Sequence, residues 1–345
     1  MWFSRVKIGV LGFLIGGALG TLVAQDVHFS QYVSLPVYVN PALTGFHSGK
    51  FRINAVYRDQ WRAIPAPFMT AALTADAPIP IKALRNDRVG AGMFIYHDRA
   101  GAPGLGFVTT DIRLQGSFMK MLSYSQYLSA GISFSYASRK LEYDKATTDA
   151  QWTGWAFDPD RPIGENFDPM AGFVDLGVGV AWFGIPNDKL QFLVGGSAFH
   201  PLRPNISVTD IYKDRLNIRF GIHGQVQYNV NPKFAIIPGL WAWMQGPHIE
   251  GIGGLLFKIN LSKRGGGYYG GGDVHAISFG GMFRVNDAVI PMVRYEYEGF
   301  TIMASYDLTI SRLSQANNGF GGFEVGIGYI MLEKRGRSMF KTPRF

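Results

Sequence analysis

The stretch that decides the fold is residues 26–61, DVHFSQYVSLPVYVNPALTGFHSGKFRINAVYRDQW, whose two halves follow different physics. Pro36 and Pro41 remove backbone donors and favour extended geometry in the residues before them. Residues 26–45 therefore read as an ordered but irregular segment. From Phe51 onward, apolar and polar side chains alternate with a period of two, which predicts a β-strand. The rest of the chain repeats this second half many times.

The alternation predicts about 14 antiparallel strands. In residues 216–228, for example, one face is mainly apolar while the other carries Asn, Arg, Gly, His and Gln. The repeat of about 20 residues per strand and connection is longer than the roughly 8 to 12 residues of a soluble sandwich. An even number of strands is typical of a closed single-chain barrel. The predicted strands are 50–61, 67–77, 88–98, 105–118, 123–138, 173–183, 189–200, 215–229, 232–244, 248–261, 273–285, 288–297, 300–310 and 320–332.

Composition places this barrel in a membrane. No run after residue 25 approaches the roughly 18 uninterrupted apolar residues of a spanning helix. Nevertheless 47% of the residues are hydrophobic and only 17% are charged, which is unusual for a soluble exported domain. We therefore predict an all-β fold: a transmembrane outer-membrane β-barrel of about 14 antiparallel strands, with an ordered N-terminal segment and a short basic C-terminal tail.

The sequence also predicts how the chain is divided into segments. Arg5 and Lys7 precede an apolar stretch, which indicates a secretory signal peptide cleaved after Ala24 or Gln25. The chain has no cysteine, so neither a lipoprotein acylation site nor a disulfide framework is expected. The predicted segments are the signal peptide at 1–25, a periplasmic or plug-like segment at 26–49, the barrel at 50–332 and a basic periplasmic tail at 333–345.

The N-terminal segment is too apolar to be left in water, so we expect it to pack against the barrel, in or beneath its lumen. Whether the lumen is open or plugged stays undecided by the sequence. The residues expected to pack are Phe29, Tyr32, Tyr38, Asn40 and Pro41.

Two further regions are candidate partner-binding surfaces. With both termini expected in the periplasm, the longest connection, about residues 139–172, faces outward. Its aromatic residues suit protein binding. The C-terminal tail is strongly basic and suits an acidic periplasmic partner or cell-wall polymer. The candidates are Trp152, Trp155, Phe157 and Phe167 in the connection, and Lys334, Arg335, Arg337, Lys341 and Arg344 in the tail.

The sequence predicts no catalytic, metal or cofactor site. Glu296 and Glu298 share a strand face with Arg294, which is typical of a solvated charge ladder at a barrel rim rather than of acid–base catalysis. The seven histidines lack metal-ligand spacing. The net charge of +8 is too modest to imply nucleic acid. We therefore expect a protein that acts by binding, not an enzyme.

Several short blocks appear in a characteristic order: FSQY (29–32), NPALTG (40–45), YRDQW (57–61), SYDLTISRL (305–313), GFGGFEVGIGY (319–329) and TPRF (342–345). Together they resemble the PorP/SprF family of type IX secretion system outer-membrane proteins. Because the blocks lie at both ends and the strand pattern between them is compatible, the resemblance covers nearly all of the chain after the signal peptide.

This resemblance implies an outer-membrane component of type IX secretion or gliding machinery, in a Gram-negative, Bacteroidetes-like envelope. The implied partners are a secreted surface adhesin, which the protein would help to export or anchor, and periplasmic secretion-system or peptidoglycan-linked proteins, besides outer-membrane lipid. The alternative that the residues leave open is a general diffusion porin or a substrate-specific channel. A barrel enzyme is the third candidate.

Overall fold

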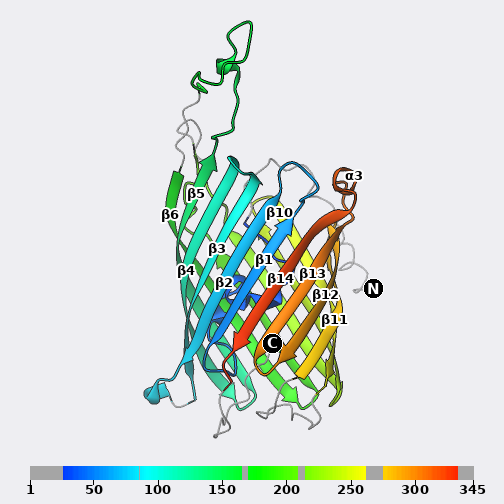
Figure 1. Ribbon diagram of the computed structural model, residues 1–345. Helices are drawn as coiled ribbons and strands as arrows, with labels where there is room; N and C mark the ends of the chain where they lie inside the picture. Colours follow the sequence, from blue (N-terminus) through cyan, green and yellow to red (C-terminus); the bar gives the residue numbers. More distant parts are fainter. Residues whose placement is uncertain (1–25, 85, 165–169, 209–213, 262–274, 333–345) are drawn as a thin grey trace, which may run out of the picture.

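The computed structural model describes residues 26–332 apart from residue 85 and residues 165–169, 209–213 and 262–274. Within these residues, fourteen antiparallel strands close into one barrel (Figure 1). The predicted signal peptide and basic tail lie outside the described residues. The strands are β1 (Arg52–Gln60), β2 (Phe68–Ile79), β3 (Arg88–Ala102), β4 (Leu105–Ser123), β5 (Gln126–Glu142), β6 (Met170–Asn187), β7 (Leu190–Phe199), β8 (Arg219–Asn231), β9 (Phe234–Gln245), β10 (His248–Asn260), β11 (His275–Arg284), β12 (Ala288–Tyr297), β13 (Phe300–Thr309) and β14 (Phe320–Ile330).

Each strand pairs with its neighbours in sequence, and β1 closes the barrel on β14. The closing register runs from Arg52 opposite Ile330 to Gln60 opposite Gly322 without a break. A closed antiparallel barrel leaves no unpaired sheet edge, which a lipid environment requires. The predicted outer-membrane barrel is therefore confirmed.

The helical pieces are short, and none of those described is long and apolar enough to cross a membrane. We call the end of the barrel that carries residues 143–164 the outer mouth, and the end at which β1 begins and β14 ends the inner mouth (Figure 1). The helical pieces are η1 (Tyr32–Ser34), α2 (Pro36–Val39), η2 (Pro41–Leu43), η3 (Lys82–Leu84), η4 (Asp149–Gln151) and α3 (Ser314–Asn317).

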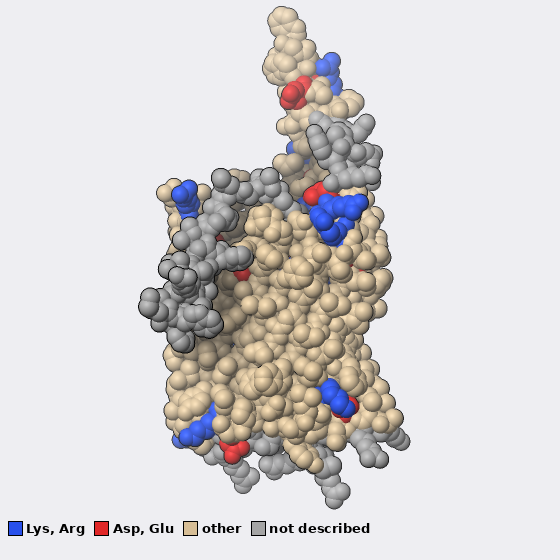
Figure 2. Space-filling view, turned by 180° about the vertical axis from the view of Figure 1, so that it is seen from behind, with Lys and Arg blue, Asp and Glu red and all other residues tan. Residues whose placement is uncertain are grey.

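Alternation sets the two faces of the wall. In β14, Glu324 is fully buried inside, whereas its neighbour Val325 is 45% exposed outside. The same rule repeats around the barrel, and Figure 2 shows the result as a broad band largely free of Lys, Arg, Asp and Glu, with charges towards its two ends. Such a band is the surface that hydrocarbon solvates.

The strand ends depart from the sequence prediction in two informative ways. β4 continues to Ser123, beyond the predicted residue 118, because ladder pairing with β5 persists past the apolar stretch. In β8, Phe220 is 51% exposed and Arg219 is 2% exposed, so the predicted facing of this strand is confirmed. The strand begins at Arg219 instead of the predicted residue 215, so Phe220 is its second residue and lies near the outer mouth.

Candidate functional site

Residues 26–49, which we call the plug, lie inside the barrel (Figure 1). Proline starts two of its short helical pieces, Pro36 in α2 and Pro41 in η2, at a position where the missing N–H costs nothing. The plug has its own aromatic core, in which the Tyr38 ring meets Phe29 edge-on at 5.3 Å and Trp241 of β9 at 5.9 Å. The structure places all the predicted packing residues in buried positions: Phe29, Tyr32, Tyr38, Asn40 and Pro41.

Ser30 and Gln31 anchor the outer half of the plug to two buried carboxylates. The backbone N–H groups of Ser30 and Gln31 donate to the two oxygens of Glu324 at 2.9 and 2.8 Å. The Ser30 hydroxyl donates to Asp307 Oδ1 at 2.7 Å. Each carboxylate therefore replaces solvent for plug groups that have no strand partner.

Two arginines neutralise the same carboxylates. Arg58 donates to Glu324 at 3.0 Å and to Asp307 at 2.8 Å, and Arg284 donates to Asp307 at 2.9 Å. Both guanidinium groups also donate to the Ser30 hydroxyl oxygen, at 2.7 and 2.6 Å. The four charged side chains are at most 2% exposed. Because an unpaired buried charge is costly, this network ties the plug and four strands to one arrangement.

Asn40 anchors the middle of the plug to β6 and β7. Its Oδ1 accepts from the Ala42 N–H at 2.9 Å, which caps η2. Its Nδ2 donates to the carbonyl oxygens of Val180 and Gly196 at 2.9 and 3.1 Å. The contact depends on glycine in the wall, since a Cβ at Gly179 would stand only 1.9 Å from Asn40 Oδ1.

The inner end of the plug is held by Asp76 of β2. Asp76 accepts from the Gly45 N–H at 2.7 Å and from two nitrogens of Arg52 at 2.9 and 2.8 Å. Gly45 has a φ of +67°, and a Cβ there would come within 2.7 Å of a neighbouring strand's backbone. The Lys50 N–H then donates to the Met331 carbonyl at 2.8 Å, at the inner mouth.

The outer end of the plug is held by an ion cluster around Asp26. Its carboxylate lies 2.7 Å from His200 Nε2 and 2.9 Å from Arg219 Nη1. Its N–H donates to Gln245 Oε1 at 3.0 Å. The other ring nitrogen of His200 bonds to Asp175, so the imidazole lies between two carboxylates.

This arrangement favours the charged form of both Asp26 and His200. Burial alone would raise the pKa of the Asp26 carboxyl, but His200 and Arg219 outweigh it and hold that pKa well below its usual range. Burial would lower the pKa of His200, but Asp26 and the hydrogen bonds to Asp175 and Asp26 raise it overall. His200 also has a φ of +64°, a strained conformation for a residue with a Cβ, which the two carboxylate contacts help to hold.

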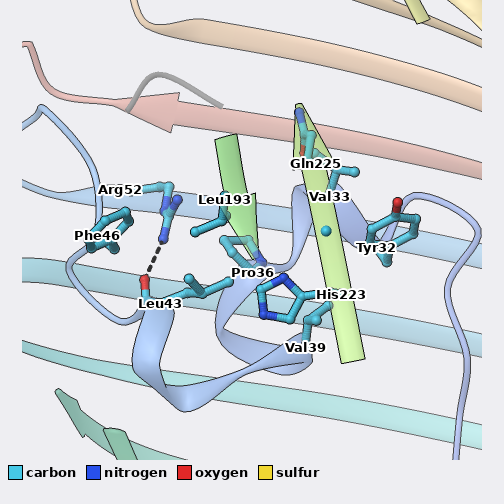
Figure 3. A pocket seen from close by; sticks show the side chains of 11 residues that line it. Tyr32, Val33, Pro36, Val39, Leu43, Phe46, Arg52, Leu193, His223 and Gln225 are labelled. Atoms are coloured by element: carbon cyan, nitrogen blue, oxygen red, sulfur yellow. Dashed lines mark hydrogen bonds between the residues drawn. The ribbon is translucent and has the colours of Figure 1, made fainter. Parts of the chain in front are cut away.

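The plug does not fill all of the inner half of the lumen. A small hollow, partly continuous with solvent, lies between the plug and the wall (Figure 3). Its plug side is apolar, with Val33, Pro36 and Val39, and its wall side includes His223 and Gln225. The lining offers no set of groups suited to catalysis. Across the described part of the chain, no group of three or more His, Cys, Asp or Glu residues could hold a metal ion.

The expected charge ladder near Glu296 is corrected by the structure. Glu296 is 9% exposed and pairs with Lys258 and with Arg294, whose Nε lies 2.9 Å from its carboxylate. The Glu296 side chain therefore faces the barrel interior and is buried, instead of being solvated at the rim. Alternation alone gave the correct face but could not show that β10 brings Lys258 across from it.

The described part of the outer connection, residues 143–164, forms a tower above the outer mouth (Figure 1). Its tip folds back as a small hairpin in which Trp152 pairs with Phe157 and the Thr153 N–H donates to the Ala156 carbonyl at 2.9 Å. Trp155, within this turn, is 93% exposed. Trp152 and Phe157 are 55% and 46% exposed.

Some of the candidate contact residues lie outside the described residues. They are Phe167 in the outer connection and Lys334, Arg335, Arg337, Lys341 and Arg344 in the tail.

Residues 22–329 match the model of the family described as type IX secretion system membrane protein PorP/SprF. The chain belongs to the PorP/SprF family. It is accordingly a membrane protein of type IX secretion, located in the outer membrane. Nothing among curated proteins matches the chain.

Several solved barrels resemble this PorP/SprF chain at low identity. It is similar to a FadL homologue of Pseudomonas aeruginosa (10% identity, 86% of this chain and 94% of that one, TM-score 0.49). It is also similar to the toluene transporter TodX of P. putida (9%, 86%, 93%, TM-score 0.47). The translocator domain of the autotransporter NalP from Neisseria meningitidis is a third (12%, 94%, 96%, TM-score 0.34). At these identities the similarities carry no functional inference.

Four of the six blocks that resemble PorP/SprF proteins meet in the outer half of the lumen. Ser30 comes from FSQY and Arg58 from YRDQW, while Asp307 and Glu324 come from the two blocks near the C-terminus. Ser30 and Asp307 are 277 positions apart in sequence and in direct contact. Sequence reasoning treated these blocks as separate signals and missed Arg284, which completes the network from β11. The signal that could have identified Arg284 is its position on the inward face of a predicted strand.

Proposed function

We propose that this PorP/SprF protein is a closed outer-membrane platform that holds a secreted surface adhesin at its outer mouth and contacts periplasmic secretion-system partners at its inner mouth. The observation that carries the proposal is the pairing of a filled lumen with the aromatic tower. Such a barrel offers binding surfaces at both ends rather than an open path between them.

The tower suits a protein partner. Trp155 is 93% exposed, so a large apolar surface is in contact with water and would be stabilised by burial against a partner. Its side chain has only two rotatable bonds, so fixing it on binding costs little conformational entropy. The hairpin bonds around Trp152 and Thr153 hold the turn in shape before binding. A preformed hairpin loses less conformational entropy on binding than an open loop.

The alternative of a diffusion porin is less well supported. A porin of this size would need a water-filled path through the lumen. Here hydrogen bonds join the plug to the wall at its outer, middle and inner levels, through Asp26, Asn40 and the Gly45 N–H. The hollow beside Pro36 occupies only part of the inner half.

The test is to replace Trp152 and Trp155 together by Ala and to measure adhesin retained on intact cells. We expect retention to be lost while barrel assembly, followed by heat-modifiable mobility on a gel, stays unchanged. The matched control is Tyr124→Ala, which removes a 78% exposed aromatic side chain from the β4–β5 turn at the other mouth. Wild-type retention in the double variant would exclude the tower as the adhesin site.

The proposal assigns the periplasmic contact to the basic tail, whose sequence suits an acidic partner or cell-wall polymer. Reversing the charge of Lys334 and Arg335 to Glu is expected to remove periplasmic proteins that co-purify with the detergent-solubilised barrel, without affecting adhesin retention. Unchanged co-purification would exclude the tail as that contact.

A further inference from the structure

The plug runs through the barrel in one direction, which contacts at its two ends establish. Asp26 binds His200 and Arg219, at the outer ends of β7 and β8. At the other end, Lys50 donates to Met331, one residue beyond the inner end of β14. The segment therefore begins at the outer mouth and leaves the lumen at the inner mouth, where β1 starts.

Contacts between these ends descend in order. Ser30 binds Asp307, the third residue from the outer end of β13. Further along, the Ala42 carbonyl accepts from Ser129, the fourth residue from the inner end of β5, at 2.6 Å. The plug therefore passes through the lumen once and does not double back to the mouth at which it started.

Loop lengths identify the mouth that faces the cell exterior. The longest connection, between β5 and β6, lies at the outer mouth, and the ten-residue connection at 310–319 lies there too. Between the described strands, four of the six inner-mouth connections, at 124–125, 188–189, 232–233 and 298–299, have two residues, against two of the seven at the outer mouth, at 103–104 and 246–247. Outer-membrane barrels have short periplasmic turns and longer external loops. Two inner-mouth connections are longer: residues 80–87 between β2 and β3, and the connection between β10 and β11, most of which lies outside the described residues.

We propose that residues 26–49 thread the barrel so that the N-terminal end of the plug is displayed at the cell surface, where Asp26 latches the plug in place. This differs from the sequence-based expectation that both ends of the chain lie in the periplasm. It also goes beyond the proposed function, since it depends on no partner.

The latch follows from how the plug is tethered. One end is continuous with β1 at the inner mouth, so the plug leaves the lumen only if its N-terminal end is drawn inward past every contact. Asp26 is the outermost described residue of the plug, and its side chain is 12% exposed and paired with two cationic groups. Breaking those pairs would leave the charges of His200 and Arg219 buried without their partner, which opposes the first step of withdrawal.

The threading is tested by placing a short epitope tag immediately before Asp26 and probing intact cells with antibody. The same tag inserted at Trp155 marks the outer surface, and one placed after Phe345 marks the inner side. We expect the tag before Asp26 to be detected on intact cells, and the tag after Phe345 only after the outer membrane is permeabilised. Detection of the former only after permeabilisation, in a barrel that retains heat-modifiable mobility, would overturn the threading.

Labelling of single cysteine substitutions tests the same threading if the epitope tag prevents folding. The chain has no cysteine, so a single substitution can be labelled with a membrane-impermeant maleimide without background. We expect Val27→Cys to be labelled in intact cells and Lys50→Cys only after permeabilisation. The reverse pattern would also overturn the threading.

The latch is tested by amide hydrogen exchange of the purified barrel. Asp26→Asn removes the charge but keeps the size of the side chain. We expect exchange at residues 27–31 to accelerate about tenfold or more, while residues 40–45, held separately by Asn40 and Asp76, keep wild-type exchange. Unchanged exchange at residues 27–31 would show that Asp26 is no latch.

Discussion

Single residues in this protein act mainly through buried charge pairs within the lumen. Ser30 is an example: its N–H donates to Glu324 and its hydroxyl donates to Asp307. Two arginines neutralise these carboxylates and also donate to the Ser30 hydroxyl oxygen. Removing any one partner would leave the others charged and without solvent. Such residues should be far more sensitive to substitution than charged residues of the rim.

The first prediction compares two glutamates that each pair with an arginine. Glu324→Ala should destabilise the assembled barrel by about 3 kcal/mol or more, because Arg58 and two plug N–H groups lose their buried acceptor. Glu142→Ala, which removes a partly exposed pair with Arg99, should cost no more than about 1 kcal/mol. The temperature at which heat-modifiable mobility is lost measures both. Equal shifts would contradict the buried network.

The second prediction concerns pH at the outer latch. The pKa of His200 is raised above its ordinary value of 6.5 because Asp26 and Asp175 outweigh its burial and Arg219. Its contribution to stability is therefore complete below pH 6.5 and is lost as the pH rises through the higher folded value. The melting temperature of the plugged barrel should fall between neutral and alkaline pH. His200→Gln should remove this part of the pH dependence, and an unchanged profile would contradict the assignment.

At the scale of elements, the sequence predicts the positions of the strands but not the path of the plug. A strand in a membrane wall repeats its chemistry every second residue, so alternation located β12 at residues 288–297 to the residue. The plug has no such period. Its apolar content predicted that it packs, but nothing in the local sequence states that it crosses the lumen or which mouth it starts from. Those facts depend on contacts such as Ser30 with Asp307, across most of the chain.

The third prediction uses depth along a strand. Val325 faces outward at the middle of β14, so Val325→Arg should cost roughly 2 to 4 kcal/mol and reduce the amount of assembled barrel. Phe220 faces outward near the outer mouth, where the same change should cost only about 0 to 1 kcal/mol. The fraction of heat-modifiable protein in the outer membrane measures the difference. Equal losses would contradict the positions of these strands in the membrane.

At the scale of the whole molecule, a closed wall is combined with a lumen that its own N-terminal segment occupies. The sequence left an open or a filled lumen undecided, because glycine and serine on the inward face can line a pore or make room for a plug. In the structure these small residues accommodate the plug: Ser129 and Ser117 donate to plug carbonyls, and Gly179 makes room for Asn40. This wall is shaped to its plug, which is the basis for regarding the protein as a platform.

The most direct test of the filled lumen is the electrical conductance of the purified protein in a planar lipid bilayer. The wild-type protein should insert without a steady conductance, because buried contacts hold the plug from Asp26 to Gly45. Deleting residues 26–45 should produce a stable, ohmic pore. A steady pore in the wild-type protein would contradict the filled lumen and return the diffusion porin as the better reading.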